Sequence, residues 1–416
     1  MGRRRDRQKF FSIATNSARL LAARRVGSIS AMSESYLPNQ FLQFLRPQLP
    51  QMLATLRRFV TVESPSLEKA AADRCCGVIA AEWSKQGARV ERVAHKHRGD
   101  LLRITHATGK SRTSRQLLVL GHYDTVYSTG TLARMPFRVK GGKAYGPGTF
   151  DMKAGIVQAF FALQALQQTK APLRKRLVFL WTSDEEIGSE ASRKFFEAEA
   201  RRSDAVFVLE PSFGPHGLLK TARKGVGEAQ LIVHGRASHA GLAPQEGINA
   251  IHELARQLTR IEKWSDFRRG VTVNAGIIEG GTRANVIPER ARAVLDLRAL
   301  RVSDMRSLEE RLHELRPIQP GARLEITGGF DRPPLESKMS AALFERARVL
   351  ASQMKLTLGE CTVGGGSDGN FTAALGIPTL DGLGAVGDGA HSAHEHVLIN
   401  TMPTRAALLA ALLATN

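Results

Sequence analysis

The first half of the chain alternates short apolar runs with helical stretches. The runs at 116–121, 176–181 and 205–209 are almost continuously apolar, and each one ends abruptly in polar residues. Such runs are typical of parallel strands that are covered on both faces. Helices are predicted between the strands, at about 153–168 and 188–200. This alternation predicts an α/β fold, in which a mostly parallel sheet is flanked by helices.

Two further helices are predicted before the first strand. One covers 37–60, where apolar residues recur every three or four positions, and the other covers about 67–86. The pattern changes between 224 and 333, where strand-like runs at 229–234, 272–278 and 292–298 combine with helices at about 247–262 and 303–315. The first pattern resumes with the segments 364–368 and 377–380 and a final helix at 402–414. We therefore predict a main domain made of 32–223 and 334–416, interrupted by a smaller α+β domain at 224–333.

Composition narrows the class of protein. The chain has 416 residues, enough for two domains. No apolar run reaches about eighteen residues, so we expect neither a membrane-spanning helix nor a membrane partner. The three cysteines are Cys361 and the adjacent pair Cys75 and Cys76, which cannot easily bridge each other. This usage fits a reducing compartment, and we expect a cytoplasmic protein.

The formal net charge is +20. Residues 1–31 hold eight basic residues and one acid, and this segment loosely resembles an organellar transit peptide, although translation could also start at Met32. We expect 1–31 to be disordered and outside the fold. The remaining charge is diffuse, which suits either a solvated basic surface or the attraction of anionic substrates. Aromatic residues are only 6% and no dense basic stripe occurs, so no nucleic-acid partner is expected.

Residues with metal-binding side chains follow the three apolar runs. His122 and Asp124 follow the first run, Glu185 and Glu186 the second, and Glu210 the third. Ligands of open α/β sheets bind beyond the carboxyl ends of the strands, so we expect these side chains at one edge. Each has an ordinary alternative, because a histidine can simply end a strand and adjacent acids can form a solvated turn.

Two more segments add candidates. Asp151 follows a glycine-rich loop and begins a predicted helix, where an aspartate is most often an N-cap. The segment 388–395 offers either His391 or His394. The combined set contains imidazoles and carboxylates without a thiolate, which suits zinc, with manganese or cobalt possible. Five ligands that include one bridging carboxylate suit a site for two metal ions.

Long segments of the chain match the motifs of one known family, in that family's order. They are GHYDTVY (121–127), GPGTFDMKAG (146–155), TSDEEIGS (182–189), LEPS (209–212), GRASHAGLAPQEGINA (235–250), GGTRANVIP (280–288), LDLRA (295–299), GGGSDGNF (364–371) and GDGAHSAHEHV (387–397). On these residues the chain, from roughly residue 40 to its end, resembles the M20 metallopeptidases, most closely their glutamate-carboxypeptidase-like branch.

The resemblance implies a complete two-metal site. Its metal ligands would be His122 and Glu210 on one ion, Glu186 and His391 on the other, and Asp151 between the two. It thereby favours His391 over His394. Asp124 would orient His122, and Glu185 would be the general base that takes a proton from the attacking water. The cofactors implied are two divalent ions, zinc first, with cobalt or manganese as alternatives.

The resemblance also implies that 224–333 is a lid that closes over the substrate and forms a homodimer. His239 would stabilise the oxyanion, in the site of the partner subunit, with help from Asn285. The substrate carboxylate would bind Arg298, whose planar fork suits it, and the backbone N–H groups of Gly365 and Gly366. The loop Arg223-Lys224-Gly225 is more basic than expected for a strict glutamate carboxypeptidase, which leaves the substrate open.

The expected function is therefore hydrolysis of an amide bond that releases a C-terminal amino acid, with glutamate as one option. The expected substrate is a peptide or an N-acyl amino acid. An N-acyl-amino-acid deacylase with the same site is the first alternative. A non-catalytic binding protein on the same fold is less favoured, because no expected ligand is missing from the sequence.

Overall fold

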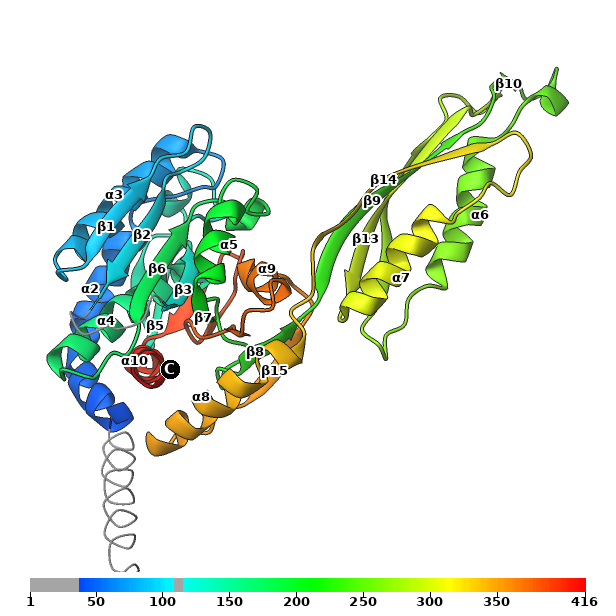
Figure 1. Ribbon diagram of the computed structural model, residues 1–416. Coiled ribbons are helices and arrows are strands. Elements are labelled where there is room, and N and C mark those ends of the chain that lie inside the picture. The colour runs from blue at the N-terminus through cyan, green and yellow to red at the C-terminus, as the bar shows by residue number, and fades with distance from the viewer. Residues whose placement is uncertain (1–36, 108–114) are drawn as a thin grey trace, which may run out of the picture.

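The computed structural model describes residues 37–107 and 115–416, so the predicted disordered segment 1–31 lies outside the described residues. Figure 1 shows a large unit around one sheet and a small unit that extends away from it. The strand order of the large sheet is β1 (Arg89–Val93), β2 (Leu101–His106), β6 (Arg176–Thr182), β3 (Gln116–His122), β7 (Ser203–Val208) and β16 (Thr379–Leu380). The last four strands run parallel, while β1 and β2 are antiparallel at one edge.

Helices cover both faces of this sheet. On one face lie α2 (Leu49–Val60), α3 (Lys69–Ser84), α4 (Ala154–Gln168), α8 (Ala341–Gln353) and α10 (Met402–Thr415), and on the other α5 (Arg193–Arg201) and α9 (Asp368–Ala374). Successive strand residues point to opposite faces. Val119 of β3 accordingly joins the cluster around α4 and α10, whereas Leu118 packs with Phe196 of α5 and Phe371 of α9. This two-sided burial explains why the strands are continuously apolar.

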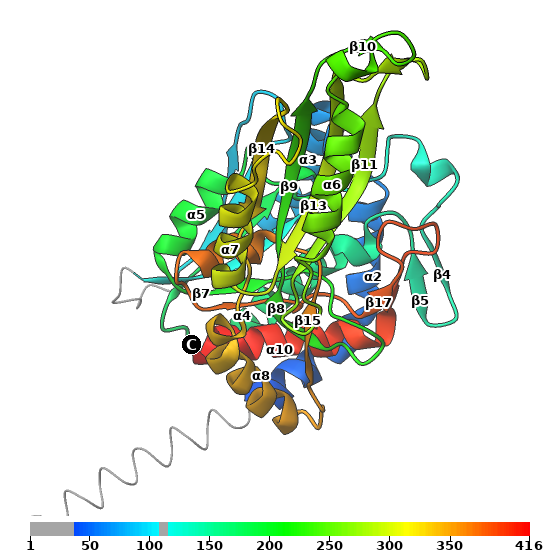
Figure 2. The same cartoon turned by 90° about the vertical axis from the view of Figure 1, so that its right-hand side faces the viewer.

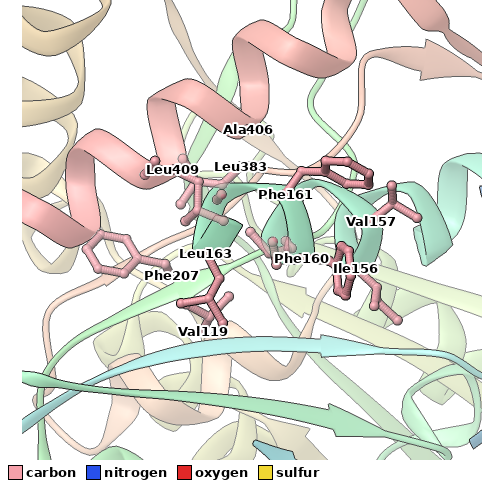
Figure 3. Close-up of a cluster of buried hydrophobic side chains, with 14 of the residues drawn as sticks. Val119, Ile156, Val157, Phe160, Phe161, Leu163, Phe207, Leu383, Ala406 and Leu409 are labelled. Atoms are coloured by element: carbon pink, nitrogen blue, oxygen red, sulfur yellow. The ribbon is translucent and has the colours of Figure 1, made fainter. Parts of the chain in front are cut away.

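The helix α4 forms a middle layer of the large unit. Figure 3 shows it between the sheet and α10, with Leu163 near Val119 on one side and Leu409 of α10 on the other. A helix enclosed in this way is expected to be apolar all round, and nearly every residue of α4 is buried. The loop that carries Asp151 leads directly into this helix, so the candidate site stands on a rigid support.

The small unit spans residues 225–332. Its sheet has the antiparallel order β11 (Thr272–Gly280), β13 (Arg290–Ala299), β9 (Gly225–His234) and β14 (Arg323–Arg332). The helices α6 (Ala250–Glu262) and α7 (Val302–His313) run along one face of it (Figure 2) and share a separate hydrophobic cluster with its strands. The short strands β10 (Ser238–His239) and β12 (Val286–Ile287) pair at the end far from the large sheet (Figure 1).

Smaller elements complete the large unit. An antiparallel sheet joins β17 (Gly387–Asp388), β18 (His396–Leu398), β5 (Lys143–Tyr145) and β4 (Arg138–Lys140), and β8 (Leu219–Arg223) pairs in parallel with β15 (Glu360–Val363). Among the described residues, no helix has the length and apolar character needed to cross a membrane.

The elements differ from the sequence-based predictions at several places. The helix predicted over 37–60 is interrupted by a 3-10 turn at Arg46–Gln48, because Pro47 and Pro50 cannot donate helical hydrogen bonds. The helix predicted from 188 begins only at Arg193, since Gly188 and Ser189 adopt left-handed conformations. The strands β1, β2 and β14 and the helix α8 were not predicted. They are partly exposed, so their apolar patterns are weaker.

Candidate metal centre

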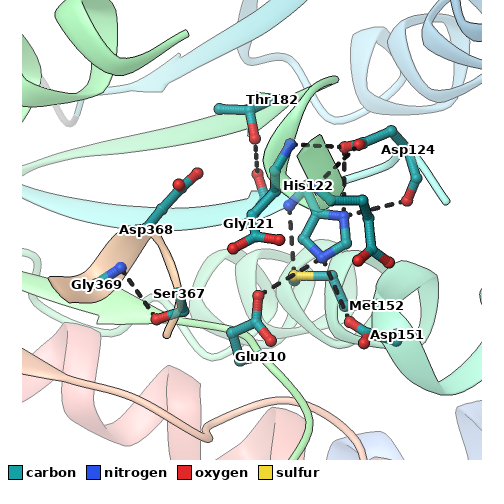
Figure 4. A network of polar contacts seen from close by, with 12 residues as sticks. Gly121, His122, Asp124, Asp151, Met152, Thr182, Glu210, Ser367, Asp368 and Gly369 are labelled. Atoms are coloured by element: carbon teal, nitrogen blue, oxygen red, sulfur yellow. Dashed lines mark hydrogen bonds and ion pairs between the residues drawn. The ribbon is translucent and has the colours of Figure 1, made fainter. Parts of the chain in front are cut away.

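His122 stands at the carboxyl end of β3 and is almost fully buried. Its Nδ1 lies 3.1 Å from the backbone carbonyl of Asp124 and 3.4 Å from the Oδ1 of the same residue. Its Nε2 points the other way, 3.3 Å from Asp151 Oδ1 and 3.5 Å from Glu210 Oε1 (Figure 4). A ring nitrogen fixed by a carboxylate and a carbonyl leaves the opposite nitrogen free to bind a metal.

Asp151 presents one carboxylate oxygen to each of two histidines. Oδ1 lies 3.3 Å from His122 Nε2, and Oδ2 lies 3.5 Å from His391 Nε2. Oδ1 is also buried and has no hydrogen-bond partner in the described part of the chain. A buried carboxylate oxygen without a partner is costly unless a cation or donor reaches it. The donor set and this orphaned oxygen therefore fit a pair of divalent cations bridged by Asp151.

The second histidine, His391, lies beside Glu186. Its Nε2 is 3.1 Å from both carboxylate oxygens of Glu186. His394, the alternative in the sequence, instead contacts Ser392 Oγ through its Nδ1 at 2.9 Å. A tetrahedral zinc with ligand bonds of about 2.0–2.1 Å places its ligand atoms about 3.3 Å apart, close to the observed spacings.

The two candidate ligand groups overlap at His122. One group is His122, Asp151 and Glu186, and the other is His122, Glu185 and Glu210; within each, the ligand atoms lie within 4.8 Å of one another. Burial, together with the charge of Asp151, raises the pKa of Glu186 to about 7, although His391 opposes the shift. Hydrogen bonds to Asp151 and Glu186 raise the pKa of His391 to about 10. Without a cation, Asp151 and Glu186 therefore favour the protonated form of His391. A divalent ion that binds there would displace the proton.

Glu185 and Asp124 connect the ligands to their surroundings. Glu185 Oε1 accepts a hydrogen bond from Arg332 Nη1 at 2.8 Å. Burial raises the pKa of Glu185, against the opposing charge of Arg332. Asp124 accepts hydrogen bonds from Ser66 Oγ at 2.7 Å and from the backbone N–H groups of Glu185 at 3.4 Å and Glu186 at 3.3 Å. One carboxylate thus links His122 to the turn that carries both acids.

Sequence reasoning missed the role of Glu395. This residue is 1% exposed, and its carboxylate accepts three backbone hydrogen bonds from the glycine-rich loop. Oε1 binds the N–H groups of Phe150 at 2.8 Å and Asp151 at 3.0 Å, and Oε2 binds that of Gly148 at 3.0 Å. Glu395 therefore fixes the loop that presents Asp151. The only sequence signal was an acid close to His391 in the same motif.

The basic loop at 223–225, which left the substrate open in the sequence, begins with a buried arginine. Arg223 is buried and donates from Nε to Asp381 Oδ2 at 2.7 Å. Its Nη1 donates to the carbonyls of Gly365 and Gly366, at 3.1 Å each. Gly366 packs closely against Arg332, because an added Cβ would lie 2.5 Å from Cδ of that side chain and would force it to shift. Arg223 thus contacts the glycine loop from within the protein.

Three candidate residues, His239, Asn285 and Arg298, lie on the small unit, apart from the metal ligands of the large unit. His239 lies on β10 at the far end, where its Nδ1 accepts from the N–H groups of Gly241 and Leu242 at 3.1 Å each. Asn285 lies beside it, since its carbonyl accepts from Ala240 N. Arg298, at the opposite end of β13, reaches the large unit by donating to Gly364 O at 3.3 Å. Within one chain, Arg298 therefore contacts the large unit, whereas His239 and Asn285 lie at the far end of the small unit.

Comparison with known protein families gives one match over most of the chain. The profile of Peptidase family M20/M25/M40 matches residues 118–415. Carboxypeptidase G2 of Pseudomonas sp. (strain RS-16) is 32% identical over 384 residues, which cover 90% of this chain and 91% of that protein. Acetylornithine deacetylase of Myxococcus xanthus is 30% identical over 273 residues, covering 61% and 68%. Succinyl-diaminopimelate desuccinylase of Dechloromonas aromatica is 28% identical over 331 residues, covering 73% and 85%.

Solved structures share the same fold. The aminopeptidase PepT of Bacillus cereus superposes with a TM-score of 0.71 at 22% identity, covering 88% of this chain and 98% of that one. An M20 family metallo-carboxypeptidase of Sulfolobus solfataricus gives 0.64 at 18% identity, covering 87% and 98%. A dinuclear metal binding peptidase of Bacillus subtilis gives 0.64 at 15%, covering 89% and 98%. The chain therefore shares its fold with these three solved proteins over nearly their whole length.

Proposed function

This chain belongs to peptidase family M20/M25/M40, whose members hydrolyse peptide or amide bonds, and we propose that it is a two-metal carboxypeptidase. It would release a C-terminal amino acid, with glutamate as one option. One observation carries the proposal: Asp151 offers its two oxygens to two separate histidines. Similarity to carboxypeptidase G2 over nine-tenths of both chains supports the choice of reaction.

We propose one assignment of ligands to the two ions, which the family resemblance implies and these distances support. His122 and Glu210 would hold one ion, Glu186 and His391 the other, with Asp151 between them. We propose zinc, because nitrogen and carboxylate ligands at these spacings suit it, with cobalt or manganese as alternatives. When bound, such a metal pair lowers the pKa of a water molecule toward neutrality and polarises the scissile carbonyl.

The protein residues would supply the proton transfers. Glu185 would take a proton from the attacking water and pass it to the leaving amine, as a carboxylate with a raised pKa can do near neutral pH. Arg332 would hold the Glu185 side chain in place through its 2.8 Å contact. Asp124 would keep the His122 ring oriented, so that Nε2 faces the site.

The substrate carboxylate would bind where the two units meet. Arg298 lies there and is now paired with Asp296, donating from Nε at 2.9 Å and from Nη2 at 2.8 Å. A substrate carboxylate would have to compete with Asp296 for this guanidinium. The backbone N–H groups of Gly365 and Gly366 would complete the anchor, because Arg223 binds the carbonyls of the same residues.

We propose a homodimer formed through the small unit. The edge strand β11 is exposed, including Ile277 at 52% and Ile278 at 59%. An exposed apolar edge strand readily pairs with another strand, and a two-fold pair is the commonest symmetric arrangement. A dimer would also explain the distant position of His239, which would stabilise the oxyanion in the site of the partner subunit.

The alternative reaction is deacylation of an N-acyl amino acid, because two of the relatives are an acetylornithine deacetylase and a desuccinylase. The test is to purify the protein, measure its bound metals, and screen peptides against N-acyl amino acids with and without a chelator. Two metals per chain and chelator-sensitive release of a C-terminal residue would support the carboxypeptidase. Preference for short acyl groups would support the deacylase, and a metal-free inactive protein would refute both.

A further inference from the structure

Arg223 links a candidate metal ligand to the glycine loop at 364–367. It ends β8 and is 3% exposed. Two edges of its guanidinium are used by hydrogen bonds: Nε donates to Asp381, and Nη1 donates to the carbonyls of Gly365 and Gly366. Asp381 is itself fully buried and also accepts from Ser367 Oγ at 2.5 Å. The arginine and its partners therefore hold the glycine loop from two sides.

The remaining edge of the guanidinium faces Glu210. Arg223 Nη2 lies 3.6 Å from Glu210 Oε2 and has no hydrogen-bond partner in the described part of the chain. The other oxygen, Oε1, lies 3.5 Å from His122 Nε2. The carboxylate of Glu210 is thus placed between an arginine and a histidine, with a single oxygen on the side of the candidate metal.

The charges make this arrangement stable. The buried guanidinium of Arg223 lies between two carboxylates, with Nε 2.7 Å from Asp381 Oδ2 and Nη2 3.6 Å from Glu210 Oε2, so its charge is balanced inside the protein. Removal of one partner of a buried charge pair leaves the other uncompensated, which is strongly destabilising. Lysine could keep the charge, but its single ammonium cannot contact Asp381, two carbonyls and Glu210 together.

We infer that Arg223 is a positioning residue, which limits Glu210 to one metal-facing oxygen and anchors the glycine loop beside the metal centre. The inference rests on the proposed function, since it requires a metal ion at Glu210. It assigns Arg223 no direct contact with substrate. In the sequence, Arg223 suggested an effect on substrate preference. In the structure it instead contacts the candidate metal ligand Glu210.

The test compares three variants with the unmodified protein. Arg223→Lys keeps the charge, and the double variant R223M/D381N removes both members of the buried pair, so it has no uncompensated charge at Asp381. Arg103→Met is the matched control, because Arg103 on β2, next to the edge strand β1, pairs with Glu199 and Glu91 and is also partly buried. Circular dichroism establishes that each variant is folded. Zinc affinity is measured by competition with a chelator, and the visible spectrum of the Co²⁺-loaded protein reports coordination number.

The expected result is selective. Both Arg223 variants should bind one of the two metals about 10–100-fold more weakly, as is usual when a residue that supports a metal ligand is lost. Their Co²⁺ spectra should change, Arg223→Lys should be the milder variant, and Arg103→Met should match the unmodified protein. Unchanged affinity and spectrum in R223M/D381N would overturn the inference while leaving the proposed function intact. Absence of metal binding by the unmodified protein would instead overturn both.

Discussion

Replacing Glu395 by alanine should destabilise the loop that carries Asp151. The carboxylate is 1% exposed and accepts from the backbone N–H groups of Gly148, Phe150 and Asp151 at 2.8–3.0 Å. Alanine offers no acceptor, so three buried N–H groups would lose their partner. Glutamine keeps one oxygen for two of them and turns an amide N–H₂ toward the third.

The magnitude follows from these contacts. A buried donor without a partner costs about 1–3 kcal/mol, so three of them give a gross loss of about 3–9 kcal/mol. Part of this loss is offset, because burial raises the pKa of Glu395 and its removal relieves the cost of a buried charge. We expect Glu395→Ala to lower the free energy of unfolding by about 3–5 kcal/mol, and Glu395→Gln by about 1–2 kcal/mol.

The assay is urea denaturation of the metal-free protein, because bound metal would add its own stabilisation. Glu345→Ala is the control: Glu345 pairs with Arg348 on the surface of α8, and its loss should leave the denaturation midpoint in place. Metal affinity, measured separately, should also fall in Glu395→Ala, since Asp151 loses its support. A change in unfolding free energy below about 1 kcal/mol would refute the reasoning, because one lost partner alone should cost that much.

Four further outcomes are expected. Glu185→Gln should retain bound metal and lose turnover by about 10²–10⁴-fold, measured as hydrolysis rate against metal content. Metal binding to the metal-free protein at pH 8 should release protons, because His391 has a pKa of about 10, and affinity should fall as pH falls; calorimetry in buffers of different ionisation enthalpy measures this. Burial raises the pKa of Cys76 to about 11, so a thiol reagent should label the partly exposed Cys361 and leave Cys76 unlabelled until the protein unfolds. Ile278→Lys should give a monomer in analytical ultracentrifugation and reduce activity; a dimer of normal affinity would exclude β11 as the interface.

The sequence located much of the candidate site through local patterns. Buried parallel strands need continuous apolar runs, and their carboxyl ends meet at one edge, so His122, Glu186 and Glu210 were expected close together. The structure places all three around Asp151 or His122. The proposed roles of these residues remain predictions. The choice between His391 and His394 was beyond local pattern, because both follow the same loop at similar spacing, and only the family motif favoured one.

Local patterns were weaker where elements are half exposed. The strand β14 contains Gly328 and Gly329, which interrupt the alternation of a strand, and β1 is largely solvent-facing. Their existence depends on pairing with β9 and β2, respectively. Such pairing joins residues that are distant in sequence, so the apolar pattern of either segment alone does not predict the strand.

The sequence by itself determined which acids and histidines follow the apolar runs, and that no thiolate is among them. Only the tertiary structure decided which side chains support these acids and histidines. Glu395 supports the Asp151 loop from 244 residues away, Arg332 meets Glu185 across 147, and Arg223 meets Asp381 across 158. The charged side chains that make these contacts look like ordinary surface charges in the sequence. Burial makes these contacts important for stability, because a charge or N–H group that is removed from water is costly unless it is paired within the protein.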